Sequence, residues 1–556
     1  MNPSQATDRA AAAASQLATP PAIRPAFQPA NQPVTTPPVA TPSMRPDALP
    51  LLTRRQAQRW AASLPLLALA TTGTIAATTA AAALPAQAGT PGEDEPPPAQ
   101  PPRPLPVPVL SQQQLANGLT VVCAPRPGAP LVSLMLMVRA GAEADPPGRA
   151  GTAAMTATLL AKGARRGGRE VSATVLARQA EALGGALEVN SGWRASTVSM
   201  TVTTPRAPEA LALMADVLRQ PLLAADELAR ARTQTLDGLR VSLGDPGQVA
   251  ALTLRRAFWG NTAYGSVVTP AAVQRLQRAD LQRYHAQWYR PERTVLVVAG
   301  DLTAEAAAAL AQRLLGDWRA SAPAPAEPAP ARPAAIDAPL VLVDMPGTGQ
   351  AGVAVAAPFV ASEVDGAQRR VAQVANAVLG GGYSARLNQE VRIKRGLSYG
   401  AGSAVEAHPG AGMFSASAQT NHPTAAQVLQ ILRDQVSQLA SQPPSADELA
   451  ARQATLVGSF ARRLETNGGL ASLVLGQLVQ GRPLDELNRY AAEVMAVTPQ
   501  QVADFARTHW TAGGLRAVIA GDLAAAGDSL KPQADGALRV PLAQLDLADA
   551  RLRRAR

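Results

Sequence analysis

Cysteine, lysine and aromatic side chains are scarce in this chain of 556 residues, and each scarcity excludes a class of protein. Cys123 is the only cysteine, so neither an intrachain disulfide nor a thiolate metal cluster can form. Aromatic residues make up 3% of the chain, so any core must be built mainly from Ala, Leu and Val. The formal charge of +10 comes mostly from scattered arginines without interleaved aromatics, so no nucleic-acid-binding face is expected.

The N-terminal region carries export signals rather than the pattern of a folded domain. Residues 1–43 form a Pro- and Ala-rich extension that is predicted to be disordered, and a start at Met44 would give a leader of ordinary length. Residues 44–88 combine paired arginines, an apolar run and Ala86-Gln87-Ala88, a combination typical of a secretory signal peptide. Their charge-free stretch is also long enough to span a bilayer, so an uncleaved anchor is the alternative. We expect an exported, periplasmic protein that is membrane-anchored only if this segment is not cleaved.

Proline-rich segments divide the rest of the chain into two parts of similar length. A linker at 89–109 precedes a predicted domain at 110–318, and a Pro/Ala run at 319–338 separates this domain from a second one at 339–525. Residues 526–556 form a tail. Pro/Ala runs favour extended, semi-rigid conformations, which suits a spacer between domains.

The two halves repeat one another. Val295–Leu302 and Leu515–Leu523 both end in Ala-Gly-Asp-Leu, and each follows a helical pattern of similar sequence, at 279–288 and 499–510. Thr498 is placed to cap the second of these helices. Strand-like alternation opens each half and apolar helical patterns follow it. We therefore predict an α+β fold in which a mainly antiparallel sheet covered by helices is present twice.

The duplicated halves and several local sequences resemble the pitrilysin/insulinase (inverzincin) family of zinc peptidases. The resemblance covers residues 110–525 and is carried by Asn117-Gly118-Leu119, Tyr264-Gly265, 289–301 and, most closely, 380–399. Active members of that family hold zinc with a His-x-x-Glu-His helix and a Glu from a later helix. The Glu within the motif acts as general base on the zinc-bound water.

The zinc-binding residues of that family are missing here. Aligned on Gly151 and Lys162-Gly163, the two histidine positions fall on Ala154 and Thr158, and the general-base position falls on Ala157. The later glutamate falls on Gly238. No metal or other cofactor is therefore expected on this chain.

Two alternative sources of metal ligands receive little support from the sequence. The supporting acid of the later helix falls on Ala231, and a register shift of one would bring in only Asp237, a lone carboxylate that holds zinc poorly. The four histidines show no pair with ligand spacing; they are His285, His408, His422 and His509.

The second half keeps Arg392 and Tyr399 in the sequence Arg-Ile-Lys-Arg-Gly-Leu-Ser-Tyr. The resemblance implies that the matching arginine and tyrosine bind the substrate backbone and stabilise charge developing on the scissile carbonyl. The alternative is structural, with Arg392 capping a helix C-terminus and Tyr399 packing beside Gly396. Gly380-Gly381-Gly382 lacks a phosphate-loop ending and is expected to form a tight turn. The strand predicted at Phe414–Thr420 is a candidate for the sheet edge that binds peptide.

The first half lacks the zinc ligands while the second half keeps the arginine and the tyrosine, and this asymmetry predicts a heterodimer. A paralogous subunit with an intact zinc motif would supply zinc and base, while this chain supplies Arg392, Tyr399 and half of a chamber for unfolded peptides. A peptide-holding or assembly scaffold without catalytic contribution is the second hypothesis. An independent peptidase with a novel site is the third.

Overall fold

The computed structural model describes residues 105–554 with several internal gaps, at 321–322, 324, 327–331, 360–365, 409–410 and 534. The predicted extension at 1–43 and the signal peptide or anchor at 44–88 lie outside the described residues, as do most of the first linker and part of the second. None of the helices in the described part of the chain combines the length and apolar character that a membrane span needs.

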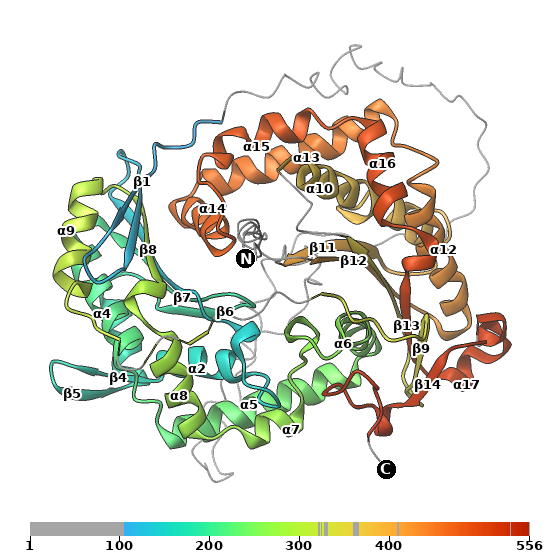
Figure 1. The fold of residues 1–556 in the computed structure, drawn as a ribbon, viewed down its shortest axis with the longest axis horizontal. Helices are drawn as coiled ribbons and strands as arrows, with labels where there is room; N and C mark the ends of the chain where they lie inside the picture. The colour runs from blue at the N-terminus through green and yellow to red at the C-terminus, as the bar shows by residue number, and fades with distance from the viewer. Residues whose placement is uncertain are drawn as a thin grey trace, which may run out of the picture. The chain divides into compact units, whose positions relative to one another are not determined.

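The first half forms a six-stranded sheet of order β1-β2-β8-β3-β7-β6 (Figure 1). Strands β2 and β8 run parallel, and the other neighbours run antiparallel. The strands are β1 (Ser111–Gln114), β2 (Thr120–Pro125), β3 (Leu131–Val138), β6 (Glu188–Ser191), β7 (Ser196–Thr203) and β8 (Thr294–Gly300), with a separate ribbon of β4 (Gly163–Arg166) and β5 (Arg169–Ser172). The helices are α2 (Thr152–Leu160), α3 (Ala173–Ala182), α4 (Ala207–Arg219), α5 (Ala225–Gly244), α6 (Pro246–Trp259), α7 (Pro270–Arg275), α8 (Arg278–Trp288) and α9 (Ala304–Leu315).

The second half forms another six-stranded sheet, of order β11-β12-β10-β13-β9-β14. Its strands are β9 (Leu340–Asp344), β10 (Ala351–Phe359), β11 (Ala401–His408), β12 (Ala411–Thr420), β13 (Arg516–Gly521) and β14 (Leu538–Pro541). Its helices are α10 (Gly366–Gly380), α11 (Arg386–Asn388), α12 (Ala425–Gln438), α13 (Ala446–Leu464), α14 (Asn467–Val479), α15 (Glu486–Met495), α16 (Pro499–His509) and α17 (Leu523–Ala526). A short π-helix, Gln389–Ile393, continues α11.

The predicted duplication and α+β class are confirmed strand by strand. The second sheet contains, next to β14, the five consecutive strands β9, β13, β10, β12 and β11. They match β2, β8, β3, β7 and β6 of the first sheet in order and direction. The repeated Ala-Gly-Asp-Leu segments are the ends of β8 and β13, and the helices before them are α8 and α16. Thr498 caps α16, because its side chain accepts a hydrogen bond from the Gln501 backbone N–H.

The sixth strands differ between the sheets. β1 precedes β2 and pairs with it antiparallel, whereas β14 comes from the C-terminal tail and pairs with β9 in parallel. Downstream of β14, Leu547 and Leu552 are buried in the core beneath it. Strand β14 of the tail therefore completes the second sheet.

The two halves each lend a helix to the sheet of the other. Helix α6 of the first half packs on β10 and β13, and α14 of the second half packs on β3 and β8 (Figure 1). Along β8 the side chains alternate between two cores: Val295 and Val297 contact the α14 side, and Leu296 and Val298 contact the other. This burial on both faces explains the continuous apolar runs of the strands.

The predicted strand at Phe414–Thr420 forms part of β12. It is not a sheet edge, because β11 and β10 pair with it on its two sides. The edge strand is β11, which begins two residues after Tyr399. Consecutive residues 402–407 of β11 are all partly exposed, as expected for a strand at the margin of a sheet.

Candidate functional site

Helix α2 carries the two positions predicted from the sequence to replace the family's histidines. Ala154 and Thr158, one turn apart, both lie on the exposed face of this otherwise buried helix. The Thr158 hydroxyl donates to the Ala154 carbonyl at 2.9 Å, while Ala157 faces the interior. The helix therefore exposes both predicted positions to solvent. Neither side chain there is an imidazole or a carboxylate that could bind zinc.

Asp145 holds the start of α2, a role that was not predicted from the sequence. Its carboxylate accepts hydrogen bonds from the backbone N–H groups of Gly151, at 2.6 Å, and Ala153, at 2.7 Å. These are helix N-terminal donors that would otherwise lack partners. Gly151 adopts a left-handed conformation with φ of 97°. An acidic residue shortly before a glycine and an apolar helix is the signal that could have identified this cap.

Helix α5 carries Gly238, the position predicted from the sequence to replace the family's later zinc ligand. Gly238 lies in the middle of this 20-residue helix, exposed and with open space around it. Asp237 is exposed as well and pairs with Arg240 at 2.8 Å. Ala231 is buried beside Met155 and Leu159 of α2, so α2 and α5 still pack together.

The donor set does not fit zinc. Among the described residues, no group of three His, Cys, Asp or Glu side chains is placed to hold a metal ion. The four histidines are engaged elsewhere: His285 Nε2 lies 2.8 Å from the Leu218 carbonyl, His408 Nε2 lies 2.7 Å from Glu406, His422 Nε2 lies 3.4 Å from the Thr348 hydroxyl, and His509 lies against the ring of Phe505. Burial lowers the pKa of His285, as suits a neutral structural imidazole.

Arg392 and Tyr399 lie together. The guanidinium carbon Cζ of Arg392 lies 4.6 Å from the centroid of the Tyr399 ring and 5.1 Å from that of Tyr383. Tyr399 is 84% exposed and Tyr383 is 58% exposed. In the described part of the chain the guanidinium contacts these rings and makes no hydrogen bond or ion pair. We call these three side chains the Arg392 stack.

The structural alternative for these residues does not match the geometry. The helix containing Arg392 ends by backbone bonds, with the Gly396 N–H donating to the Arg392 carbonyl and the Leu397 N–H donating to the Val391 carbonyl, both at 2.9 Å. Gly396 permits this ending with a left-handed φ of 61°. A Cβ added to Gly396 would meet nothing within 4 Å, and the ring of Tyr399 lies against the guanidinium of Arg392.

The buried side chain of Asn388 holds the backbone on both sides of the Arg392 stack. The fully buried side-chain amide of Asn388 donates to the Tyr383 carbonyl at 2.6 Å and accepts from the Ala401 N–H at 3.3 Å. Gly380 of the predicted tight turn lies against β11, where an added Cβ would approach the Ser403 nitrogen to 2.2 Å. These contacts lock exposed side chains onto a rigid segment.

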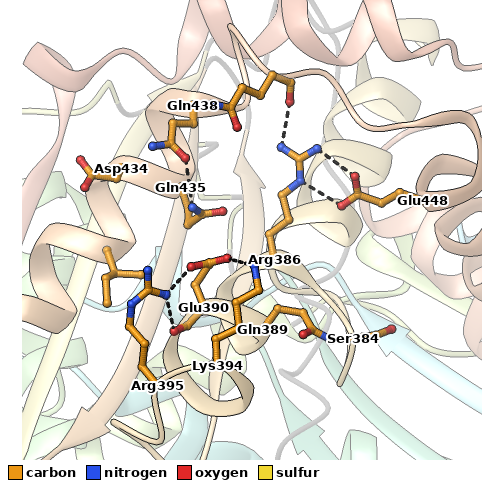
Figure 2. Close-up of a pocket in the computed structure, with 12 residues that line it drawn as sticks. Ser384, Arg386, Gln389, Glu390, Lys394, Arg395, Asp434, Gln435, Gln438 and Glu448 are labelled. Carbon is orange, nitrogen blue, oxygen red and sulfur yellow. Dashed lines mark hydrogen bonds and ion pairs between the residues drawn. The ribbon is translucent and has the colours of Figure 1, made fainter.

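A polar cavity of about 600 Å³ flanks this segment. Figure 2 shows that its charged groups face one another: Arg386 forms two bonds with Glu448, at 2.9 and 2.8 Å, and Glu390 receives both Lys394 and Arg395. The hydrogen bond from Lys394, followed by that from Arg395, lowers the pKa of Glu390. These pairs hold residues 386–395 in place, while Arg392 and Tyr399 lie outside the cavity lining.

A buried cluster joins the end of β11 to the first half. The ring of His408 stacks on Tyr264 at 3.8 Å, and the Tyr264 hydroxyl donates to Glu143 at 3.0 Å. Glu406 accepts two bonds from Arg255, at 3.1 and 2.5 Å.

The predicted site residues form two groups: Ala154 with Thr158 on α2, and Arg392 with Tyr399 before β11.

Two family models match this chain. The model of the insulinase family, peptidase family M16, matches residues 120–270, and that of the peptidase M16 inactive domain matches residues 275–456. Together they span more than half of the chain.

Relatives match along most of their length. An uncharacterized zinc protease of Streptomyces coelicolor is 26% identical over 402 residues, which cover 71% of this chain and 85% of that protein. A non-peptidase homologue of Helicobacter pylori is 23% identical over 388 residues, covering 68% and 86%. The crystal structure of a peptidase M16 inactive domain from Pseudomonas fluorescens superposes with a TM-score of 0.66 and 25% identity, over 74% of this chain and 98% of that one.

Proposed function

Because this chain belongs to the insulinase family of peptidases, family M16, and lacks the family's zinc ligands, we propose that it is the non-catalytic subunit of a heterodimeric zinc metallopeptidase of the periplasm. The single observation that supports this most strongly is the asymmetry between its two groups of site residues. Ala154, Thr158 and Gly238 can bind no metal, whereas the half-buried Arg392 and the exposed Tyr399 lie on a segment that many contacts hold in place.

Arg392 and Tyr399 supply hydrogen-bond donors to the scissile peptide. A guanidinium and a phenol are donors that can meet negative charge as it develops on a carbonyl oxygen. Arg392 has no acceptor among the described residues, so its N–H groups are available to a substrate. Zinc and the general base come from the partner subunit, whose His-x-x-Glu-His helix provides what α2 of this chain lacks.

The substrate is an extended, unfolded peptide. Edge strand β11 begins two residues after Tyr399, and no strand of the described sheet pairs with its outer side. A peptide added there as a further strand would place its backbone beside the Arg392 stack. A folded protein presents few extended segments, so short unfolded peptides are the substrate class.

Peptide hydrolysis tests this proposal directly. The chain alone, a paralogue with an intact zinc motif, and their mixture are each assayed with an intramolecularly quenched, unstructured peptide, with and without a zinc chelator. We expect activity that requires both proteins and is lost with the chelator. Chelator-sensitive hydrolysis by this chain alone would refute the proposal, and a paralogue that is fully active without this chain would favour the scaffold function.

A further inference from the structure

Tyr383 is the third member of the Arg392 stack and has no role in the reaction proposed above. Its ring centroid lies 5.1 Å from Arg392 Cζ, comparable to the 4.6 Å of Tyr399. A guanidinium over an aromatic face is held by its attraction to the ring's electrons, and this contact uses none of its N–H donors. Two such contacts therefore restrict the orientation of the guanidinium while leaving its edge free.

The position of Tyr383 is fixed although its ring is exposed. The Asn388 amide donates to the Tyr383 carbonyl at 2.6 Å, and Arg452 donates to the carbonyl of the next residue, Ser384, also at 2.6 Å. Before it, Gly381 lies so close to α10 that an added Cβ would approach Ala377 Cα to 2.6 Å. An exposed aromatic ring on so constrained a turn gains little from burial, so stability alone does not account for it.

Exposed large hydrophobic side chains gather at this segment. Tyr383, Ile393 and Tyr399 belong to the small set of such residues in the described chain, and all three lie between α10 and β11. Two of them, Tyr383 and Tyr399, contact a cation that has no ion pair among the described residues, and exposed apolar groups of this kind are typical of a binding surface. A guanidinium whose faces contact aromatic rings can still donate hydrogen bonds in its own plane. Carbonyl or carboxylate oxygens of a peptide are suitable acceptors for them.

We propose that Tyr383 is a positioning residue that holds the Arg392 guanidinium in the orientation in which its N–H edge meets the backbone carbonyls of an extended peptide. The inference rests on the proposed function for its catalytic consequence. The ring, rather than the phenolic hydroxyl, carries the effect, because the contact with Arg392 is made by the ring face.

Two variants separate the ring from the hydroxyl. Tyr383→Phe keeps the ring and Tyr383→Leu removes it, and Met495→Leu, an exposed apolar change on α15, is the matched control. The first readout is the Nε–Hε resonance of Arg392 in the full chain carrying ¹⁵N-labelled arginine, assigned by its loss in Arg392→Lys. Ring removal is expected to shift this proton downfield, while Tyr383→Phe and the control leave it close to its original position.

The second readout is hydrolysis of the quenched peptide by the mixture with the zinc-motif paralogue. An exposed cation–π contact corresponds to about a two- to fivefold loss of kcat/KM in Tyr383→Leu, with recovery in Tyr383→Phe. An unmoved Arg392 resonance in Tyr383→Leu, or equal losses in both variants, would overturn the inference. If the resonance moves but even Arg392→Ala leaves hydrolysis unchanged, the positioning stands and the proposed catalytic role of Arg392 fails.

Discussion

Arg392 Cζ lies 4.6 Å from the centroid of the Tyr399 ring, which makes the two residues that resemble the family's substrate-binding pair direct neighbours. Seven positions separate them in the sequence, and the left-handed turn at Gly396 brings them together. On α2, the predicted metal-site positions Ala154 and Thr158 are exposed on one helix face, but they carry no metal-binding side chain. The first half thus keeps an exposed helix face without metal ligands, and the second half keeps the arginine and tyrosine that resemble the family's pair.

Removal of the Tyr399 hydroxyl tests its role as a donor. Tyr399→Phe keeps the ring against Arg392 and deletes the phenolic O–H, so kcat of the mixture with the paralogue should fall by about a hundredfold, as for loss of one oxyanion donor. The KM should change less, and the circular dichroism spectrum should stay the same because the side chain is exposed. A kcat within about twofold of wild type would contradict this role, since one lost donor is expected to cost far more.

Gly238 should be a stabilising substitution site. It lies inside helix α5 and is exposed, and a methyl group added at its Cα would meet nothing within 4 Å. Glycine inside a helix is less favourable than alanine, so Gly238→Ala should raise the free energy of unfolding by about 0.5–1 kcal/mol. Urea denaturation measures this change, and Gly244→Ala at the end of the same helix serves as the comparison. A loss of stability would mean that Gly238 has contacts which the described residues do not provide.

Three substitutions should restore a metal site on the first half. Ala154→His and Thr158→His place two imidazoles one turn apart on the exposed stripe of α2, and Gly238→Glu adds a carboxylate from α5. Ala157 is left unchanged because a glutamate there would be buried. Titration calorimetry should detect zinc binding in the triple variant and none in Ala154→His alone. If the triple variant binds no better than the single one, the assignment of these positions is wrong.

The stability contributed by Glu406 should depend on pH. Burial acts to raise the pKa of Glu406, but the charge of Arg255, followed by the hydrogen bond and charge of His408, outweighs burial and lowers the pKa to about 2 from an ordinary value of 4.5. A lowered folded-state pKa means that the contribution is complete above about pH 4.5 and is lost as the pH falls toward 2. The shift corresponds to about 3 kcal/mol.

Denaturant unfolding at several pH values measures this dependence. Glu406→Gln should lower stability at pH 7 and flatten the decline between pH 4.5 and 2. Glu170→Gln is the control, because Glu170 and its partner Arg165 are both exposed and lie outside the buried cluster. An identical pH profile for wild type and Glu406→Gln would contradict the account.

Local sequence was sufficient to predict the repeated elements. The Ala-Gly-Asp-Leu segments predicted strands that became β8 and β13, and Thr498 capped α16, because these features depend on neighbouring residues. The tight turn expected at Gly380-Gly381-Gly382 also followed from a short motif, since the chain turns between the end of α10 and the start of α11.

The exchange of α6 and α14 between the halves could not be predicted in the same way. An apolar helix face shows that the helix must be buried, but it does not show which sheet will cover it. For the same reason β12 was a candidate edge, since alternation within Phe414–Thr420 does not reveal that β11 lies outside it. The stacking of Tyr383 on Arg392 depends on the turn that Asn388 holds, which involves contacts distant in sequence.

The most direct test of the central claim is hydrolysis of the quenched peptide by the mixture of this chain and its zinc-motif paralogue, with wild type compared to Arg392→Ala. Arg395→Ala is the matched control, because Arg395 lies in the same segment but is paired with Glu390. The account predicts that activity requires both proteins, is lost with Arg392→Ala and persists with Arg395→Ala. Full activity of the mixture with Arg392→Ala would contradict a shared active site.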